Sequence, residues 1–256
     1  MYKINFEQPV HVHFIGIGGI SMSGLAEVLL EEHFTISGSD NKRSPLTEQL
    51  EKAGVTIFYG QKASNIIEGI DVVVYTAAIH EDNEEYQAAV QKGLPMLSRA
   101  ELLGQLMTNY DTPIAVSGTH GKTTTTSMLS HILLSAEMDP TISVGGILKA
   151  IGGNIRVGNS EIFLTEACEY TNSFLHFFPK IGVILNIDED HLDFFKDLAD
   201  IRHSFRKFAE LLPADGTLVI NGEIPELHEI TDGLACRVVT YGPDSSYDYS
   251  ATNILH

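Results

Sequence analysis

The sequence predicts an α/β protein: an N-terminal Rossmann-like, doubly wound parallel sheet, then a P-loop-type α/β ATPase domain that looks truncated. Two observations predict this class. Short apolar runs alternate with amphipathic stretches along the chain, which is typical of strands followed by helices in a parallel sheet. Two of the turns between them are rich in glycine, as expected where a parallel strand feeds a helix at a ligand site.

The elements of the first domain follow from this alternation. Strands are expected at 10–15, 34–36, 55–58, 71–75 and 95–97. Helices are expected at 21–32, 45–53, 83–91 and 99–107. Each helix lies between two strands, so the strands should run parallel in one sheet.

A turn-rich stretch at 109–113 punctuates the chain and places a domain boundary near residue 110. The pattern then restarts, and the two domains are expected at 1–110 and 111–256. In the second, strands are expected at 114–117, 162–164, 181–185 and 217–220, and helices at 122–135 and 198–211. A strand that begins at Ala251 has no partner after it, so the second domain is expected to be incomplete.

Composition excludes several classes of function. Lys and Arg total 16 against 34 Asp and Glu, a net charge of -18, so the surface should repel nucleic acid and anionic membranes. No apolar run is long enough to span a bilayer, and the first residues do not resemble a secretory signal. The 2 cysteines fit a reducing compartment, which predicts a cytoplasmic protein. The sequence carries no signal of oligomeric state.

The second glycine-rich turn has the chemistry of a triphosphate-binding loop. It follows the strand at 114–117 and runs Gly118, Thr119, His120, Gly121, Lys122, Thr123, Thr124. Backbone N–H groups of such a loop and the helix N-terminus attract phosphate oxygens, while the lysine reaches the terminal phosphates and the Thr123 hydroxyl can ligate magnesium. The general P-loop has a glycine where this chain has Val116. An ordinary glycine turn is the alternative, but it rarely needs Gly-Lys-Thr-Thr at this point.

The first glycine-rich turn is similar to a dinucleotide fingerprint. Gly16, Gly18 and Gly19 lie between a strand and a helix, Ser21 replaces the third glycine, and Asp40 ends the second strand, where a ribose hydroxyl would bind. The same physics fits NAD or any other diphosphate, including that of a UDP-sugar. The pattern does not choose between them.

Polar residues follow two later strands of the second domain. Glu166 and Glu169 come after the strand at 162–164, and the run from Asn186 to His191 comes after the strand at 181–185. Parallel strands gather ligands at their carboxyl ends, so these side chains could meet the P-loop. One magnesium ion could then bridge Thr123 and Glu166. Solvated loop residues are the alternative, which we accept for Asp188, Glu189 and Asp193 but not for Glu166 and His191.

Three other groups are predicted to be structural. His11 and His13 alternate on one strand and are expected to be packed or hydrogen-bonded. His120 is expected to contribute its backbone more than its ring, and no base is paired with the thiol of Cys168.

At this point the chain resembles the Mur ligases of bacterial cell-wall synthesis, from about His11 to about Gly242. The resemblance rests on HFIGIGGISMSGLAEVL, SGSD, VVYTAAI, RAELL, SGTHGKTTTT, EACEYTNSF, NIDEDHLD and GTLVINGEIPEL. The family's P-loop is shortened, which accounts for Val116. Cys168 and Tyr170 depart from the commoner Glu-Ala-Asp-Glu-Ser-Asp form, without removing a metal ligand.

The resemblance implies a ligand set and a role for each matching residue. It is strongest to the alanine-adding branch, which lacks the carbamylated lysine that related ligases would place near Arg206. It implies UDP-N-acetylmuramate, L-alanine and ATP as substrates and Mg²⁺ as cofactor. The implied UDP-sugar site is Gly16, Gly18, Gly19, Ile20, Ser21, Ser39, Asp40, Thr76 and Ala77. The implied ATP site is Gly118, Thr119, His120, Gly121, Lys122, Thr123, Thr124 and Asn186. Lys122, Glu166 and His191 are implied to be catalytic, with Thr123 and Glu166 holding a first magnesium ion and His191 a second metal ion.

The implied reaction makes an amide in two steps. The sugar carboxylate attacks the γ-phosphate of ATP, and the amine of alanine then displaces phosphate from the acyl phosphate. The family's amino-acid-binding third domain is absent from these residues, so they are expected to bind the UDP-sugar without turnover. The alternatives are a sister ligase that attaches a recycled peptide to the same sugar, an NAD-dependent oxidoreductase suggested by the first loop alone, and a module that only binds.

Overall fold

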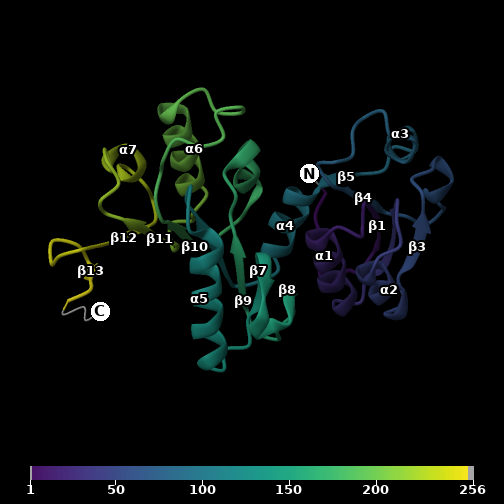
Figure 1. The fold of residues 1–256 in the computed structure, drawn as a ribbon, viewed down its shortest axis with the longest axis horizontal. Coiled ribbons are helices and arrows are strands. Elements are labelled where there is room, and N and C mark those ends of the chain that lie inside the picture. The colour runs from purple at the N-terminus through teal and green to yellow at the C-terminus, as the bar shows by residue number, and fades with distance from the viewer. Residues whose placement is uncertain (1, 253–256) are drawn as a thin grey trace. The chain divides into compact units, whose positions relative to one another are not determined.

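The computed structural model describes residues 2–252 and divides the chain into two compact units. The first unit contains Met1–Asn109 and a later segment, Ile151–Val157. The second contains Tyr110–Ala150 and Gly158–His256. The sequence did not predict that a segment of the second half would pack with the first unit. The two units can be followed by their colours in Figure 1.

The first unit is built from alternating strands and helices. Its strands are β1 (His11–Ile15), β2 (Thr35–Asp40), β3 (Thr56–Tyr59), β4 (Val72–Tyr75) and β5 (Met96–Ser98). Its helices are α1 (Ile20–Glu31), α2 (Pro45–Lys52), α3 (Glu84–Gln91) and α4 (Arg99–Met107), with a short 3₁₀ turn, η1 (Ala63–Asn65). Within residues 2–252 the strands form a parallel sheet in the order β3-β2-β1-β4-β5. This is the doubly wound arrangement that the alternation predicted.

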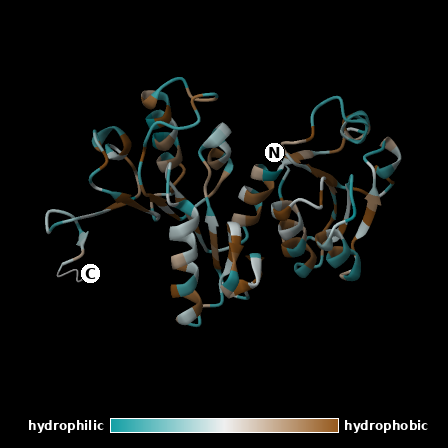
Figure 2. Cartoon of the chain, in the orientation of Figure 1, coloured by the Kyte–Doolittle hydropathy of each residue, from teal (hydrophilic) through white to brown (hydrophobic). Residues whose placement is uncertain are grey.

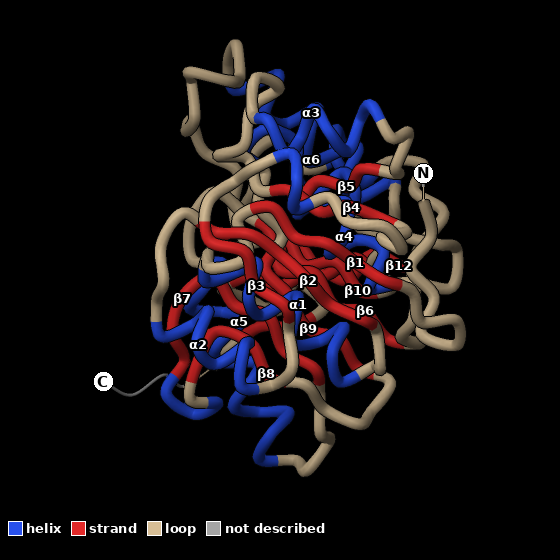
Figure 3. The backbone as a smooth tube through the Cα atoms, turned by 90° about the vertical axis from the view of Figure 1, so that its right-hand side faces the viewer, coloured by secondary structure: helices blue, strands red, loops and turns tan. Residues whose placement is uncertain are grey.

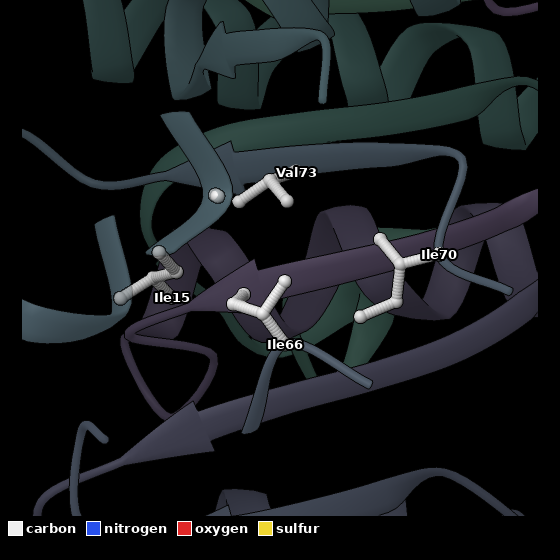
Figure 4. Close-up of a cluster of buried hydrophobic side chains, with 5 residues drawn as sticks. Ile15, Ile66, Ile70 and Val73 are labelled. Atoms are coloured by element: carbon white, nitrogen blue, oxygen red, sulfur yellow. The ribbon is translucent and has the colours of Figure 1, made fainter. Parts of the chain in front are cut away.

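Buried apolar side chains hold the helices of this unit to its sheet. One cluster contains Ile15, Ile66, Ile70, Val73 and Ala89, and Figure 4 shows the first four around strand β1. Ser44 caps the start of helix α2: its side chain accepts the N–H of Thr47 in a capping box, and Pro45 follows at the first helical position. These local signals explain why the predicted helix starts correctly.

The second unit contains the P-loop. The strands of its sheet are β6 (Thr112–Ser117), β7 (Thr141–Leu148), β8 (Gly153–Arg156), β9 (Ile162–Glu166), β10 (Ile181–Ile184), β11 (Thr217–Asn221), β12 (Arg237–Gly242) and β13 (Tyr249–Ser250). Of these, β8 lies in the segment that is assigned to the first unit. Its helices are α5 (Lys122–Ser135), α6 (Leu198–Glu210) and α7 (His228–Thr231), with 3₁₀ turns η2 (Lys149–Ile151) and η3 (Tyr170–His176). The alternation of strands and helices can be followed in Figure 3.

The described strands of this sheet run in the order β13-β12-β11-β10-β6-β9-β7-β8. Strand β6 lies between β10 and β9 and is parallel to both. Brown colour along the central strands in Figure 2 shows why they were predictable: they are apolar on both faces, as buried parallel strands are. The predicted α/β class is therefore confirmed.

Four strands were not predicted from the sequence: β7, β8, β12 and β13. Two glycines interrupt β7, which runs TISVGGIL, and β8 is a four-residue stretch. Neither has the apolar pattern of a buried strand, so tertiary pairing decided their conformation. Of the strand expected from Ala251 onward, residues 253–256 lie outside the described part of the chain.

No helix within residues 2–252 is long and apolar enough to cross a membrane.

Candidate functional site

The carboxyl ends of three parallel strands meet at one edge of the second sheet. Ser117 at the end of β6 is level with Ile184 of β10, and Val116 is level with Glu166 at the end of β9. The residues that follow these strands therefore gather around the start of helix α5, as the sequence predicted. Ligands of open parallel sheets bind at such an edge.

The P-loop joins β6 to α5 in a conformation that requires glycine. Gly118 has φ 141°, and a Cβ there would lie 2.9 Å from the Cβ of Leu185. Gly121 has φ 83° and precedes the helix without a side-chain cap on the helix N-terminus. The first N–H groups of α5 are therefore left to a ligand or to water, which is the arrangement that binds phosphate.

The Lys122 ammonium group is held inside the loop. It donates to the carbonyl oxygens of Gly118 (2.6 Å) and Thr119 (3.2 Å) and to both oxygens of Glu169 (3.1 and 2.8 Å). The Glu169 side chain is 1% exposed and that of Lys122 16%. This pair is largely shielded from solvent, so its charge attraction is strong.

The Thr123 hydroxyl contacts the Glu166 carboxylate, as the sequence predicted. Thr123 Oγ1 donates to Glu166 Oε2 at 2.9 Å, and the backbone N–H of Gly145 donates to Glu166 Oε1 at 2.7 Å. Thr123 lies in the first turn of α5 and Glu166 ends β9, so the sheet edge brings them together. A hydroxyl and a carboxylate oxygen are ligands that suit Mg²⁺.

His191 lies beside Glu169, with Nε2 3.8 Å from Glu169 Oε1. Its backbone is left-handed, with φ 53°, and the Tyr170 ring packs on its imidazole at 4.5 Å between centroids. The Tyr170 hydroxyl donates to Asp193 at 2.7 Å, and this hydrogen bond raises the pKa of the phenol. The Glu169 carboxylate therefore lies close to both Lys122 and His191.

Asn186 and Thr119 fasten the P-loop to the loop after β10. Asn186 Oδ1 accepts the N–H of His120 at 2.7 Å, and Asn186 Nδ2 donates to the His120 carbonyl at 3.0 Å. Thr119 Oγ1 accepts the backbone N–H of Asp188 at 2.9 Å. The His120 side chain is 64% exposed, so its backbone makes these contacts. Thr124 is exposed on the first turn of α5.

The donor set at Thr123 and Glu166 fits a magnesium ion that keeps water and phosphate oxygens as its other ligands. Mg²⁺ in nucleotide sites is usually held by one or two protein oxygens together with substrate phosphates. No group of three or more His, Cys, Asp or Glu side chains suited to a metal occurs in residues 2–252. The two oxygens supplied here agree with the nucleotide-dependent kind of site.

The first loop, in the first unit, lies at a similar sheet edge. Gly16 follows β1 with φ 87°, and a Cβ there would lie 2.8 Å from Thr76 Cγ2, at the end of β4. Asp40 ends β2, and its Oδ2 accepts the N–H of Gly18 at 2.9 Å. A Cβ on Gly18 would lie 2.7 Å from the same oxygen. Gly19 precedes α1 without a side-chain cap, so this helix N-terminus is also open to an anion.

The other residues predicted for the UDP-sugar site differ in exposure and in their hydrogen bonds. Ile20 is 43% exposed and Ala77 is exposed. The Ser39 hydroxyl is buried and donates to Glu85, so Ser39 supports the loop through its carbonyl, which accepts the N–H of Gly16. The Ser21 hydroxyl accepts a hydrogen bond from Arg99 at 3.2 Å.

Two residues with a clear place in these sites were not selected from the sequence. The sequence placed Glu169 after the same strand as Glu166 but indicated no role for it, because its contact with Lys122 spans 47 positions. Arg99 brings a positive charge to the first loop of an acidic protein, and it directly follows β5 at a strand end. That position, after an expected strand, is the signal that could have identified Arg99.

Two family models match the two parts of the chain. Residues 11–111 match the model described as "Mur ligase family, catalytic domain", and residues 116–256 match "Mur ligase middle domain". The chain is 64% identical over 256 residues to the UDP-N-acetylmuramate--L-alanine ligase of Agathobacter rectalis, covering 100% of this chain and 56% of that protein. It is 60% identical over 257 residues to the ligase of that name from Lachnospira eligens, again covering 56% of it. The chain thus spans about half the length of these curated relatives.

Solved structures of ligases also match the chain. A UDP-N-acetylmuramate:L-alanyl-gamma-D-glutamyl-meso-diaminopimelate ligase from Neisseria meningitides is 32% identical with a TM-score of 0.81, over 92% of this chain and 78% of that one. The UDP-N-acetylmuramate-alanine ligase of Thermotoga maritima is 30% identical with a TM-score of 0.76, over 92% and 53%. With one family model covering residues 116–256 and a second covering 11–111, the chain belongs to the Mur ligase family.

Proposed function

We propose that the chain carries the UDP-sugar-binding and ATP-binding parts of an ATP-dependent ligase that joins L-alanine to the carboxylate of UDP-N-acetylmuramate, in the cytoplasmic synthesis of peptidoglycan precursors. The observation that carries this proposal is the 64% identity across the whole chain to a ligase of that name. The open P-loop, with Lys122 and the Thr123–Glu166 pair, supports it on chemical grounds.

Each part of the chain has a proposed role. Residues 1–110 would bind the UDP-sugar, with its diphosphate on the loop from Gly16 to Gly19 and the Arg99 guanidinium nearby. Residues 111–256 would supply the ATP site. In the Mur ligases a third domain binds the amino acid, and that domain is proposed to lie outside these residues.

The proposed reaction balances in two steps. A carboxylate oxygen of the sugar attacks the γ-phosphorus of ATP, the bond to the bridging oxygen breaks, and ADP leaves. The amine of alanine then attacks the acyl carbon, phosphate leaves, and the amine loses a proton. Negative charge spreads over the transferring phosphoryl group in the first step, so positioned cations are the main source of catalysis.

The residues of the P-loop have distinct proposed tasks in that step. Lys122 would turn from Glu169 and the loop carbonyls to the phosphates, exchanging one set of anionic or polar partners for another. Thr123 and Glu166 are proposed to hold one Mg²⁺ and His191 to hold a second, and these ions would neutralise phosphate charge when bound. Asn186 would keep the loop in register with the strand beside it.

A sister ligase that attaches a recycled peptide to the same sugar is the second candidate. The Neisseria meningitides structure, at 32% identity, favours it. Identities of 57–64% to alanine ligases favour the first candidate. An oxidoreductase, suggested by the first loop alone, has no further support, because the chain belongs to a ligase family.

Calorimetric titration of this chain with UDP-N-acetylmuramate tests the proposal. We expect saturable binding of the UDP-sugar, weaker binding of UDP, and no binding of NADH. The expectation follows from the glycine loop and helix N-terminus, which recognise a diphosphate, and from the family of the chain. Binding of NADH without binding of the UDP-sugar would refute it.

Turnover gives a separate expected result. Alanine-dependent phosphate release from these 256 residues should stay at background, because they span about half the length of the ligases they match. The full-length Agathobacter rectalis ligase is the positive control. Steady release above background from the chain alone would contradict the proposed division of labour.

A further inference from the structure

The carboxylate of Glu166 is held from two sides. Thr123 donates to one oxygen from the start of α5, and the backbone N–H of Gly145 donates to the other from β7. The P-loop motif and the position after a strand predicted roles for the threonine and the glutamate. The third partner lies on a strand that the sequence did not predict, 21 positions before Glu166.

We propose that Gly145 is a positioning residue for Glu166, the metal-binding carboxylate. The N–H of Gly145 orients Glu166 toward Thr123, and the absence of a side chain at position 145 leaves room for the carboxylate. This inference rests on the proposed function of Glu166. We assign Gly145 no contact with nucleotide or metal, and it acts through Glu166.

The space around Gly145 supports the proposal that a side chain at this position would displace the Glu166 carboxylate. A Cβ built on Gly145 would lie 2.8 Å from Glu166 Oε2, 3.3 Å from Cδ and 3.4 Å from Oε1. All three atoms belong to the end of a flexible side chain, so the carboxylate would move rather than the backbone. The backbone of Gly145 has no left-handed φ, so alanine there is not strained. An added methyl group should therefore leave the fold intact and displace the carboxylate.

The neighbouring glycine provides a matched control. A Cβ on Gly146 would meet Thr123 Cγ2 at 3.7 Å, an ordinary van der Waals contact. The two glycines are adjacent on β7, and both would gain the same methyl group with the same loss of chain flexibility. A difference between G145A and G146A therefore reports on Glu166.

The binding experiment uses this chain with ATP in the presence of Mn²⁺ or Mg²⁺ and again in EDTA. We expect G145A to weaken metal-dependent ATP binding by about 10- to 100-fold, the usual cost of losing a group that orients a metal ligand. Binding in EDTA should be unchanged, and G146A should behave as the unmodified chain. In an E166A background G145A should have no further effect. Equal affinities for G145A and G146A would overturn the inference.

A crystal structure of G145A separates this inference from the proposed function. We expect the Glu166 carboxylate to have left the N–H of residue 145, with β7 unchanged. A carboxylate that still accepts this hydrogen bond in the variant would refute the positioning role, whether or not the chain binds ATP. An unmodified chain that binds no ATP would count against the proposed ATP site instead.

Discussion

Replacing Glu85 by alanine should lower the free energy of unfolding of the first unit by several kcal/mol, at about 1–3 kcal/mol for each buried group left without its hydrogen-bond partner. His13 Nε2 lies 2.7 Å from Glu85 Oε1, and both side chains are 0% exposed. Ser39 donates to the other carboxylate oxygen at 2.6 Å, and the second ring nitrogen of His13 shares a hydrogen bond with Ser37 at 2.8 Å. E85A would leave His13 and Ser39 without these partners in the interior.

A urea titration followed by far-ultraviolet circular dichroism measures this loss. E210A is the matched control, because Glu210 pairs with Arg206 at i,i+4 on helix α6 with 52% of its side chain exposed. Such a surface pair contributes about 0.3–0.5 kcal/mol. An E85A variant no less stable than E210A would show that the buried network does not stabilise the unit.

The hydrogen bonds of Glu85, His13 and Ser39 should also affect ligand binding, because Ser39 supports the first loop. The Ser39 carbonyl accepts the N–H groups of Gly16 and Ile17, so the strand that contains Ser39 holds this loop in place. The His11 pKa is lowered, first by burial and then by the nearby His13, which favours the neutral imidazole that shares Ser37. Both histidines are thus packed and hydrogen-bonded, as the sequence predicted.

K122M should have the second large effect, on ATP binding. A hydrogen bond to a charged group contributes about 1.5–3 kcal/mol, so loss of the ammonium should weaken ATP affinity by roughly 10- to 100-fold. H120A is the control within the same loop, because the His120 ring is 64% exposed and its backbone makes the loop contacts. Calorimetric titration with Mg²⁺ and ATP measures both, and H120A should bind as the unmodified chain does.

A double variant separates the charge from the packing in this result. K122M also leaves Glu169 without its cationic partner. The Glu169 side chain is 1% exposed, so the second unit should become less stable. K122M/E169Q removes that unpaired charge and should recover stability without recovering ATP affinity. Recovery of affinity in the double variant would mean that Lys122 serves the fold and not the nucleotide.

The sequence predicted most of the fold, because the signals that define these elements are local. Helix α5 begins and ends at the predicted residues, since a P-loop glycine precedes it and a β-strand of buried residues leads into it. Strands β6, β9 and β10 are apolar enough to be recognised alone. Strands β7 and β8 were missed because glycine and short length remove that pattern, and pairing with distant strands decides them.

The sequence by itself determined the chemistry of the candidate site, while only the tertiary structure decided its connections. Lys122, Thr123 and Glu166 were identified from motif and spacing, because residue type and strand ends are local properties. The contacts of Glu169 with Lys122, Arg99 with Ser21, and Gly145 with Glu166 cross 47, 78 and 21 positions. Such contacts depend on strand order and register, which arise when distant segments pack together, so no local pattern encodes them.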